Sequence, residues 1–216
     1  MGVAELKTAV AERLEPLVGG EGFGWRVSTA SFVRRSPGVV AQLVVRVERS
    51  RFREEYTLSC PLVVRHDDVE VAYHRIVGTE RSQLDAGLSP AEIRRLVRGS
   101  QTVVSSWDRT ETYPPLTMKQ LIGTGDPVVD PRRIAARALP WLERHSDRAG
   151  LRSSLEWPSG IVGLDALEKR LALHLADGDR EGARRLALQL LAEPPFTHAD
   201  PAGLVAVCTR VVDETR

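Results

Sequence analysis

The chain of 216 residues contains no asparagine, only two cysteines and only three lysines among its 30 basic residues. Cys60 and Cys208 lie far apart without a CxxC partner, which excludes a disulfide scaffold and a thiolate metal site and favours a reducing cytoplasm. No apolar run approaches about 18 residues, so no membrane-spanning helix is predicted. The dominance of arginine and the absence of asparagine are typical of a G+C-rich genome.

The chain also lacks a strong net charge. It has 30 basic and 29 acidic residues, and the balance holds on both sides of residue 127, with 17 basic against 16 acidic before it and 13 against 13 after it. A chain this close to neutral has no long-range field to attract nucleic acid, so a general DNA or RNA coat is disfavoured. Its 42% hydrophobic and 27% charged residues are those of a globular protein with an ordinary core.

The N-terminal half has the pattern of a helix followed by strands. Apolar residues recur at helical spacing from Leu6 to Leu17, with Glu5, Glu12 and Glu15 among them, which indicates an amphipathic helix rather than a signal peptide. Segments rich in Val, Phe, Tyr or Thr then predict an antiparallel meander of three strands. They are residues 25–34, 39–47 and 56–65.

Three further elements are predicted between residues 69 and 110. Residues 69–77 fit either a helix or a strand, and a strand over 71–77 is favoured. A helix is expected from Ser89-Pro90 to about Arg98 and a further strand within 101–110. Residues 112–131 hold four prolines and two glycines, so they are expected to form a linker or a long surface loop.

The C-terminal part is predicted to be helical. Helices are expected after Asp130-Pro131, with Pro140 kinking or splitting the first of them, and after Asp147 and Asp200-Pro201. The other two, at 164–176 and 180–192, would form an antiparallel helical hairpin. The fold class is therefore α+β: an antiparallel sheet of about four to five strands packed against an N-terminal helix, then a helical region. The expected division is 1–127 for the sheet domain and 128–216 for the helical region, packed on it.

A cluster of arginines is the most conspicuous candidate for a binding surface. Arginine forks beside an exposed aromatic ring can bind phosphate or stack on a base. Three glutamates in the same ten residues cancel most of the charge, so a solvated hairpin with local ion pairs is the simpler interpretation. The candidate binding residues are Arg46, Arg49, Arg51, Phe52 and Arg53.

Candidate catalytic and metal-binding residues lie between the last strand of the meander and the segment that follows it. Cys60 and His74 would form a nucleophile and base if Asp68 held the imidazole, although an inert buried thiol is the favoured interpretation of Cys60. The densest group of possible oxygen and imidazole metal ligands has no known metal-site spacing, so no metal is expected; its members are His66, Asp67, Asp68, Glu70 and His74. The glycine clusters match no phosphate-binding loop, and no cofactor is expected.

Several short motifs in order resemble a widespread bacterial family of domains of unknown function. They are Gly22-Phe23, Phe32-Val33-Arg34-Arg35, a strand with Gln42, Ser50-Arg51-Phe52, Leu58-Ser59-Cys60 and Leu139-Pro140-Trp141-Leu142-Glu143. The resemblance implies a non-catalytic, cytoplasmic α+β protein, and some members are similar to the immunity partners of bacterial toxins.

Taken with the residues, this favours a non-catalytic protein-binding module, immunity-like or accessory, that binds through its sheet face or its Arg46–Arg53 hairpin. Two alternatives stay open. One is a small enzyme using Cys60 and His74 or the His66-Asp67-Asp68 segment, and the other is a nucleic-acid accessory protein using the hairpin arginines. A protein partner is expected and a membrane is not; the partner, ligand and oligomeric state are not encoded in any motif.

Overall fold

The fold is α+β, and the chain divides into two compact units. A computed structural model describes residues 2–50, 54–78, 90–105, 112–124, 129–156, 166–193 and 200–216. The first unit comprises residues 1–64 and 104–147, and the second comprises residues 65–103 and 148–216. The units are interleaved along the chain, because each consists of two separate stretches. The single boundary expected at residue 127 stays a prediction.

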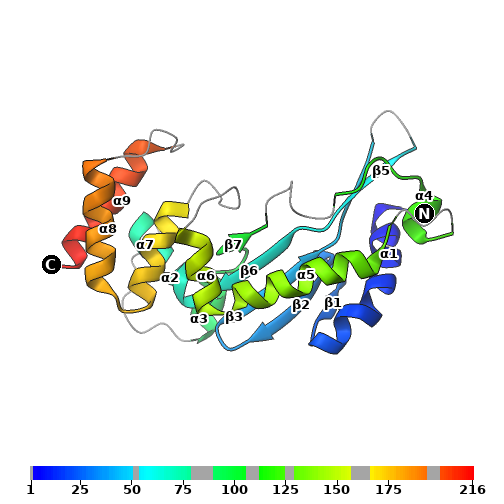
Figure 1. The fold of residues 1–216 in the computed structure, drawn as a ribbon, viewed down its shortest axis with the longest axis horizontal. Helices are drawn as coiled ribbons and strands as arrows, with labels where there is room; N and C mark the ends of the chain where they lie inside the picture. The colour runs from blue at the N-terminus through cyan, green and yellow to red at the C-terminus, as the bar shows by residue number, and fades with distance from the viewer. Residues whose placement is uncertain are drawn as a thin grey trace. The chain divides into compact units, whose positions relative to one another are not determined.

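The first unit combines a sheet with helices that cover it (Figure 1). Its helices are α1 (Val3–Val18), α4 (Met118–Ile122) and α5 (Pro131–Ser146), with short 3-10 turns at Gly19–Glu21 and Val27–Thr29. Its strands are β1 (Gly24–Arg26), β2 (Ser31–Ser36), β3 (Val39–Val44), β4 (Arg46–Arg49) and β5 (Tyr56–Ser59). The chain passes between the units within β6 (Leu62–His66) and β7 (Val103–Val104).

Two sheets replace the expected single meander. The strand order is β1-β2-β3-β6-β7 in an antiparallel five-stranded sheet, and β4 pairs antiparallel with β5 in a separate ribbon. The expected strands 39–47 and 56–65 are therefore each divided in two. Pro61 lies at the break and has no N–H to donate, while its carbonyl accepts from Val44 N at 2.9 Å. The ladder between β3 and β6 thus ends at this contact. The chain enters the ribbon after β3 and returns from β5 to β6 through Pro61.

The expected strand 25–34 is also wrong as a single element. The chain reverses at Val27–Thr29 in a 3-10 turn, and Ala30 follows with a φ of +45°, so β1 and β2 pair antiparallel with each other. The Thr29 hydroxyl lies 2.7 Å from the Ser31 hydroxyl. Such local side-chain hydrogen bonds compete with the β-ladder and favour a turn.

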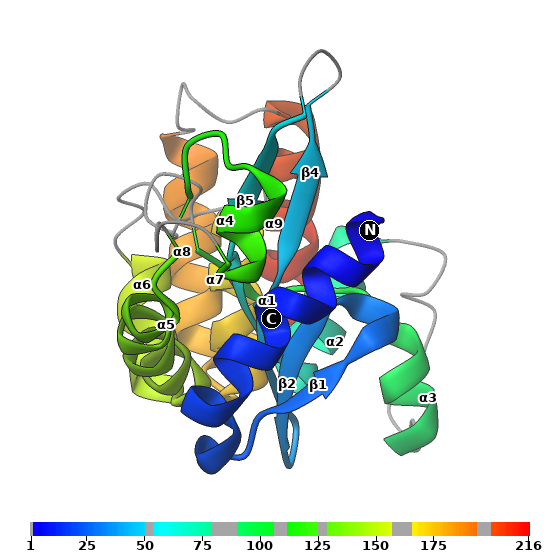
Figure 2. The same cartoon turned by 90° about the vertical axis from the view of Figure 1, so that its right-hand side faces the viewer.

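The core of the first unit lies between the sheet and the apolar stripes of α1 and α5. Leu6, Leu14 and Ile134 are almost fully buried, and burial of each such side chain contributes about 1.5–3 kcal/mol. Figure 2 shows α1 crossing β1 and β2. Helix α5 is not split at Pro140 but continues to Ser146. Trp141 is half-buried against this core and stacks on His145, with the ring centroids 3.9 Å apart.

Residues 112–131 were expected to form a linker or surface loop, and the structure corrects this. Leu116 forms an isolated β-bridge with Tyr56, and Thr117 and Gln120 form a capping box that starts α4. Leu116 and Leu121 are buried in the core. Since these apolar residues belong to the core, the described residues 112–124 and 129–131 are part of the first unit.

The second unit consists mainly of helices. They are α2 (Asp67–Val77), α3 (Pro90–Leu96), α6 (Arg148–Glu156), α7 (Ala166–Ala176), α8 (Arg180–Ala192) and α9 (Pro201–Glu214). α2 packs on α7, and α8 packs between α7 and α9. α7 and α8 match the expected hairpin, and Asp179 caps α8 by accepting from Gly182 N at 2.9 Å.

Residues 67–77 form a helix, so the favoured strand over 71–77 is wrong. Acidic residues in the first turn, Asp67, Asp68 and Glu70, stabilise a helix N-terminus, and Gly78 ends the helix with a φ of +74°. Arg210 of α9 donates to the carbonyl of Ile76 at the same end. These signals at the two ends of the segment, together with the packing of α2 on α7, make it helical.

Substitution of Gly123 tests the contact between Arg13 of α1 and the segment around α4. Its φ is +78°, and a Cβ there would come within 3.0 Å of the Arg13 guanidinium. Arg13 donates to the carbonyls of Val129 at 3.0 Å and Leu121 at 3.4 Å. We expect G123A to lower the free energy of unfolding, measured in urea, by about 1–2 kcal/mol from backbone strain plus the cost of displacing Arg13.

Gly38→Ala is the matched control, because Gly38 has a φ of +72° and open space around it. G38A should show only the loss of unfolding free energy that comes from placing alanine at a positive φ. An equal loss in G38A and G123A would contradict a structural contribution from the Arg13 contact.

Asp179 makes the hairpin sensitive to acid. The backbone hydrogen bond from Gly182, and then the hydrogen bond with His174, lower the pKa of Asp179 below 3.8. Because the pKa is lower in the folded state, the stabilisation is present above about 3.8 and is lost as the pH falls through the folded-state pKa. D179N keeps a capping side chain but loses the charge. Its deficit in stability should be largest at neutral pH and shrink in acid.

Urea unfolding at a series of pH values measures this difference, with Glu181→Gln, an exposed acid in the first turn of the same helix, as the control. A constant deficit for D179N at every pH would contradict the assigned charge effect.

Candidate functional site

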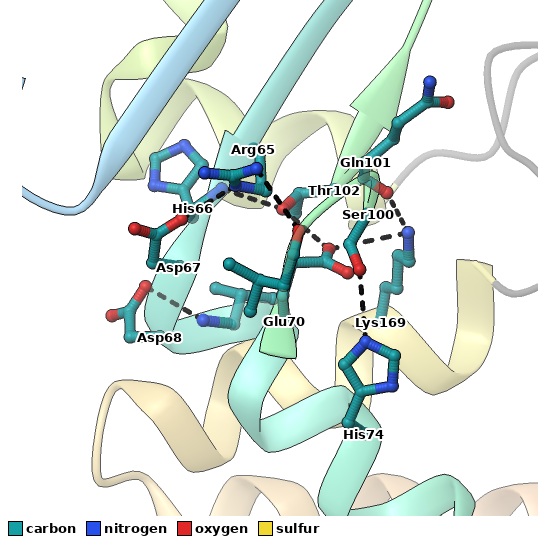
Figure 3. A network of polar contacts seen from close by, with 12 residues as sticks. Arg65, His66, Asp67, Asp68, Glu70, His74, Ser100, Gln101, Thr102 and Lys169 are labelled. Atoms are coloured by element: carbon teal, nitrogen blue, oxygen red, sulfur yellow. Dashed lines mark hydrogen bonds and ion pairs between the residues drawn. The ribbon is translucent and has the colours of Figure 1, made fainter. Parts of the chain in front are cut away.

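A buried polar network in the second unit joins α2, the segment before β7 and α7 (Figure 3). Glu70 is 1% exposed and accepts a hydrogen bond from the Thr102 hydroxyl at 2.8 Å. Lys169 is 7% exposed, and its Nζ lies 3.5 Å from Glu70 Oε1 and donates to the Gln101 carbonyl. Buried ionisable groups of this kind are candidates for a functional site.

The other polar groups of the network also have partners within the protein. The Thr102 Oγ1 accepts from His66 N at 2.8 Å, so one hydroxyl bridges β6 and Glu70. The Lys169 ammonium lies 5.2 Å from the centroid of the Tyr73 ring, a favourable cation–π arrangement. With carboxylate, hydroxyl and ammonium each engaged by protein groups, this network stabilises the packing of α2 on α7.

Four of the five residues considered as metal ligands are directed to separate partners. Asp67 pairs with Arg65 at 2.8 Å, and Asp68 pairs with Arg148. Glu70 belongs to the buried network, and His74 Nε2 lies 3.1 Å from the Ser100 hydroxyl. Within the described ranges, no three His, Cys, Asp or Glu side chains gather in a group that would hold a metal ion.

Cys60 and His74, the considered nucleophile and base, belong to different units. Cys60 is buried in the hydrophobic core of the first unit, whereas His74 and Asp68 lie on α2 of the second. Neither unit by itself contains the pair. The other thiol, Cys208, is also buried, and burial raises its pKa to about 11. Since the thiolate is the nucleophilic form, Cys208 is unreactive at neutral pH.

The arginine hairpin corresponds to the β4–β5 ribbon, in which Arg46 lies opposite Ser59 and Arg49 opposite Tyr56. Val47 and Tyr56 are buried in the core, Arg49 is exposed and Arg46 is half-buried. Arg51, Phe52 and Arg53 lie outside the described residues. The structure therefore places the base of the hairpin on the first unit and leaves its use as a binding surface a prediction.

A groove in the first unit has a better-defined shape for binding. It has a volume of about 880 Å³ and lies between the N-terminal half of α1 and the segment from β1 through the 3-10 turn. Its apolar lining consists of Val3, Ala4, Ala9, Trp25, Val27 and Ala30. The volume is in the range of sites that bind ligands, about 300–1,000 Å³.

Two residues give this groove its character. Val27 is 75% exposed and contributes apolar surface to the lining of the groove. Trp25 packs on Phe32, with ring centroids 5.0 Å apart, and is half-buried. The sequence pattern did not single out either residue, because both fell within an expected strand. The sequence does contain a turn signal at this place, because the hydroxyl side chains in Val27-Ser28-Thr29-Ala30 favour a turn.

None of the helices in the described ranges is both long and apolar enough to cross a membrane. The chain matches no protein family, no curated protein and no solved structure. The resemblance to the bacterial family of unknown function therefore stays a prediction.

The buried pair of Glu70 and Lys169 gives a test of the network. We expect K169M to lower the free energy of unfolding in urea by about 3–5 kcal/mol, because it leaves the Glu70 carboxylate buried beside an apolar side chain. E70L should also destabilise the unit, because the Lys169 ammonium then stays buried without the Glu70 carboxylate. The double variant E70L/K169M should lose much less than the sum of the two single variants.

Additive losses in this double-mutant cycle would contradict the coupling. Lys119→Met, in α4 of the first unit, is the control for loss of a lysine.

Proposed function

We propose that this chain is a non-catalytic protein-binding module, immunity-like or accessory, whose groove beside β1 takes an extended segment of a partner protein. The observation that carries the proposal is the groove itself, an apolar hollow of about 880 Å³ with the exposed Val27 on its lining. Sites that bind ligands are typically concave and mostly apolar, with a few polar groups that set orientation and specificity. Here the polar groups include Glu5, Lys7 and Glu12 of α1.

The position of the groove at the edge of the sheet favours an extended occupant. β1 is the terminal strand of the five-stranded sheet, with β2 as its neighbour. A terminal strand offers backbone N–H and carbonyl groups to an added strand, while pockets for its side chains supply specificity. In this arrangement the added segment would run along β1 and place apolar side chains against Trp25 and Val27.

Two features support a binding module over the alternatives. Cys60 is enclosed in the apolar core and Cys208 is kept protonated, which argues against a thiol enzyme. The net charge of +1 supplies little attraction for nucleic acid. We further propose a location in the bacterial cytoplasm, because both cysteines are buried thiols without a disulfide.

Selection of short random peptides displayed on phage tests this function with a defined probe. We expect enriched peptides with alternating apolar residues, and binding of the synthetic peptides to be measured by fluorescence anisotropy. V27E should weaken that binding by about tenfold or more, because it places a charge in the apolar groove. Its exposed position means that the fold should be retained, as checked by circular dichroism.

Leu188→Glu is the matched control, since Leu188 is 47% exposed on α8 of the second unit. It should leave the affinity unchanged. The proposal fails if selection enriches no peptide, or if V27E binds the selected peptides as tightly as the unsubstituted chain.

A further inference from the structure

The groove beside β1 has two charged side chains of opposite sign on its lining, Lys7 and Glu12 of α1. In the part of the chain that the structure describes, neither side chain forms an ion pair or a hydrogen bond. Lys7 is half-buried and Glu12 is exposed. Partial burial of an ammonium beside apolar surface is unfavourable without a partner, so a carboxylate brought by an occupant would stabilise Lys7.

The third charged residue on the lining is already used within α1. Glu5 Oε2 accepts a hydrogen bond from Gly2 N at 2.7 Å and completes the capping box of the helix. Its negative charge lies at the N-terminus of α1, where the helix dipole stabilises it. Lys7 and Glu12 are therefore the two charges of the lining that an occupant can pair without displacing an existing contact.

The two charges lie on either side of a strip of small side chains. At about 100° per residue, Lys7 and Glu12 are about 140° apart around α1, with Ala4 and Thr8 between them. Along the helix axis they are separated by about 7.5 Å. An extended chain advances about 6.6 Å in two residues, and side chains two positions apart point to the same side. One extended segment can thus bring two side chains to this pair of charges.

We propose that the groove selects an extended segment in which an acidic side chain pairs with Lys7 and a basic side chain, two positions away, pairs with Glu12. Exchanging the two charges of the segment would bring like charges together, which is unfavourable in an interface. The order of the acidic and basic residues therefore sets the direction in which the segment runs. This inference rests on the proposed function and adds the charge pattern and the direction of the occupant.

The opposite signs of the two residues favour a polypeptide as the occupant. A nucleic acid offers only phosphate charges, so it can pair with Lys7 but is repelled by Glu12. A polypeptide supplies carboxylate and ammonium or guanidinium groups within one short segment. The apolar residues of the groove, Trp25 and Val27, are suited to the other side chains of the same segment.

Selection of phage-displayed peptides on two forms of the chain tests the charge pattern. The unsubstituted chain should enrich peptides with an acidic and a basic residue two positions apart in one order, and K7E/E12K should enrich the opposite order. Fluorescence anisotropy at about 50 mM salt then compares a selected peptide with its charge-exchanged form. We expect the unsubstituted chain to bind the selected form about tenfold more tightly, and K7E/E12K to reverse this preference.

The controls keep the net charge of the chain unchanged. E48K/R49E makes the same exchange at two exposed positions of β4 in the same unit, outside the lining of the groove, and should keep the original preference. K7M/E12Q removes both charges without reversing them and should bind the two forms about equally. Because K7E/E12K is expected to gain affinity for the exchanged peptide, misfolding cannot produce the expected result.

Three outcomes would overturn this inference alone, provided that V27E weakens peptide binding. They are equal binding of both peptide forms by the unsubstituted chain, an unchanged preference in K7E/E12K, and loss of the preference in E48K/R49E. Enrichment of no peptide, or binding that V27E leaves intact, would instead overturn the proposed function and this inference with it.

Discussion

Burial of two apolar helix stripes in one core is the constraint on which the first unit depends. Leu6, Val10 and Leu14 form the stripe of α1, and Ile134 and Leu142 belong to that of α5; all are nearly inaccessible to solvent. The transfer of these side chains from water is the main favourable contribution to folding. It also fixes the rotation of each helix about its axis, and thereby decides which residues face outward.

The α1 side of the proposed binding groove follows from that rotation. With its leucines in the core, α1 turns Ala4, Lys7 and Glu12 toward the groove beside β1. The second unit is organised differently, around the buried carboxylate of Glu70 and ammonium of Lys169. Such a pair requires close partners, because an isolated buried charge is strongly unfavourable. Its groups are thereby committed to structure, while Lys7 and Glu12 stay at the surface of the first unit on the lining of the groove.

Elements with local signals were predictable. Asp130, Asp179 and Asp200 each accept a hydrogen bond from a backbone N–H in the first turn of a helix, and each helix was expected at that place. Elements that depend on distant partners were not. The valines of residues 67–77 suit a strand, yet packing of α2 on α7 makes the segment helical. The prolines of residues 112–131 suggested a loop, yet the core takes up Leu116 and Leu121. The candidate groove was missed for the same reason, since its walls come from two separate segments.

The amino-acid sequence by itself determined the α+β class, the leading helix, the C-terminal helical hairpin and the overall charge balance, because periodicity, caps and composition are local or additive properties. Only the tertiary structure decided where the long strands break, that residues 67–77 are helical, that Val27 is exposed beside α1, and that Lys7 and Glu12 line the same groove. These outcomes depend on which surfaces are buried against each other. Charge balance counted along the chain cannot show how charge is distributed in space, and a nearly neutral protein can therefore present two opposite charges at one apolar groove.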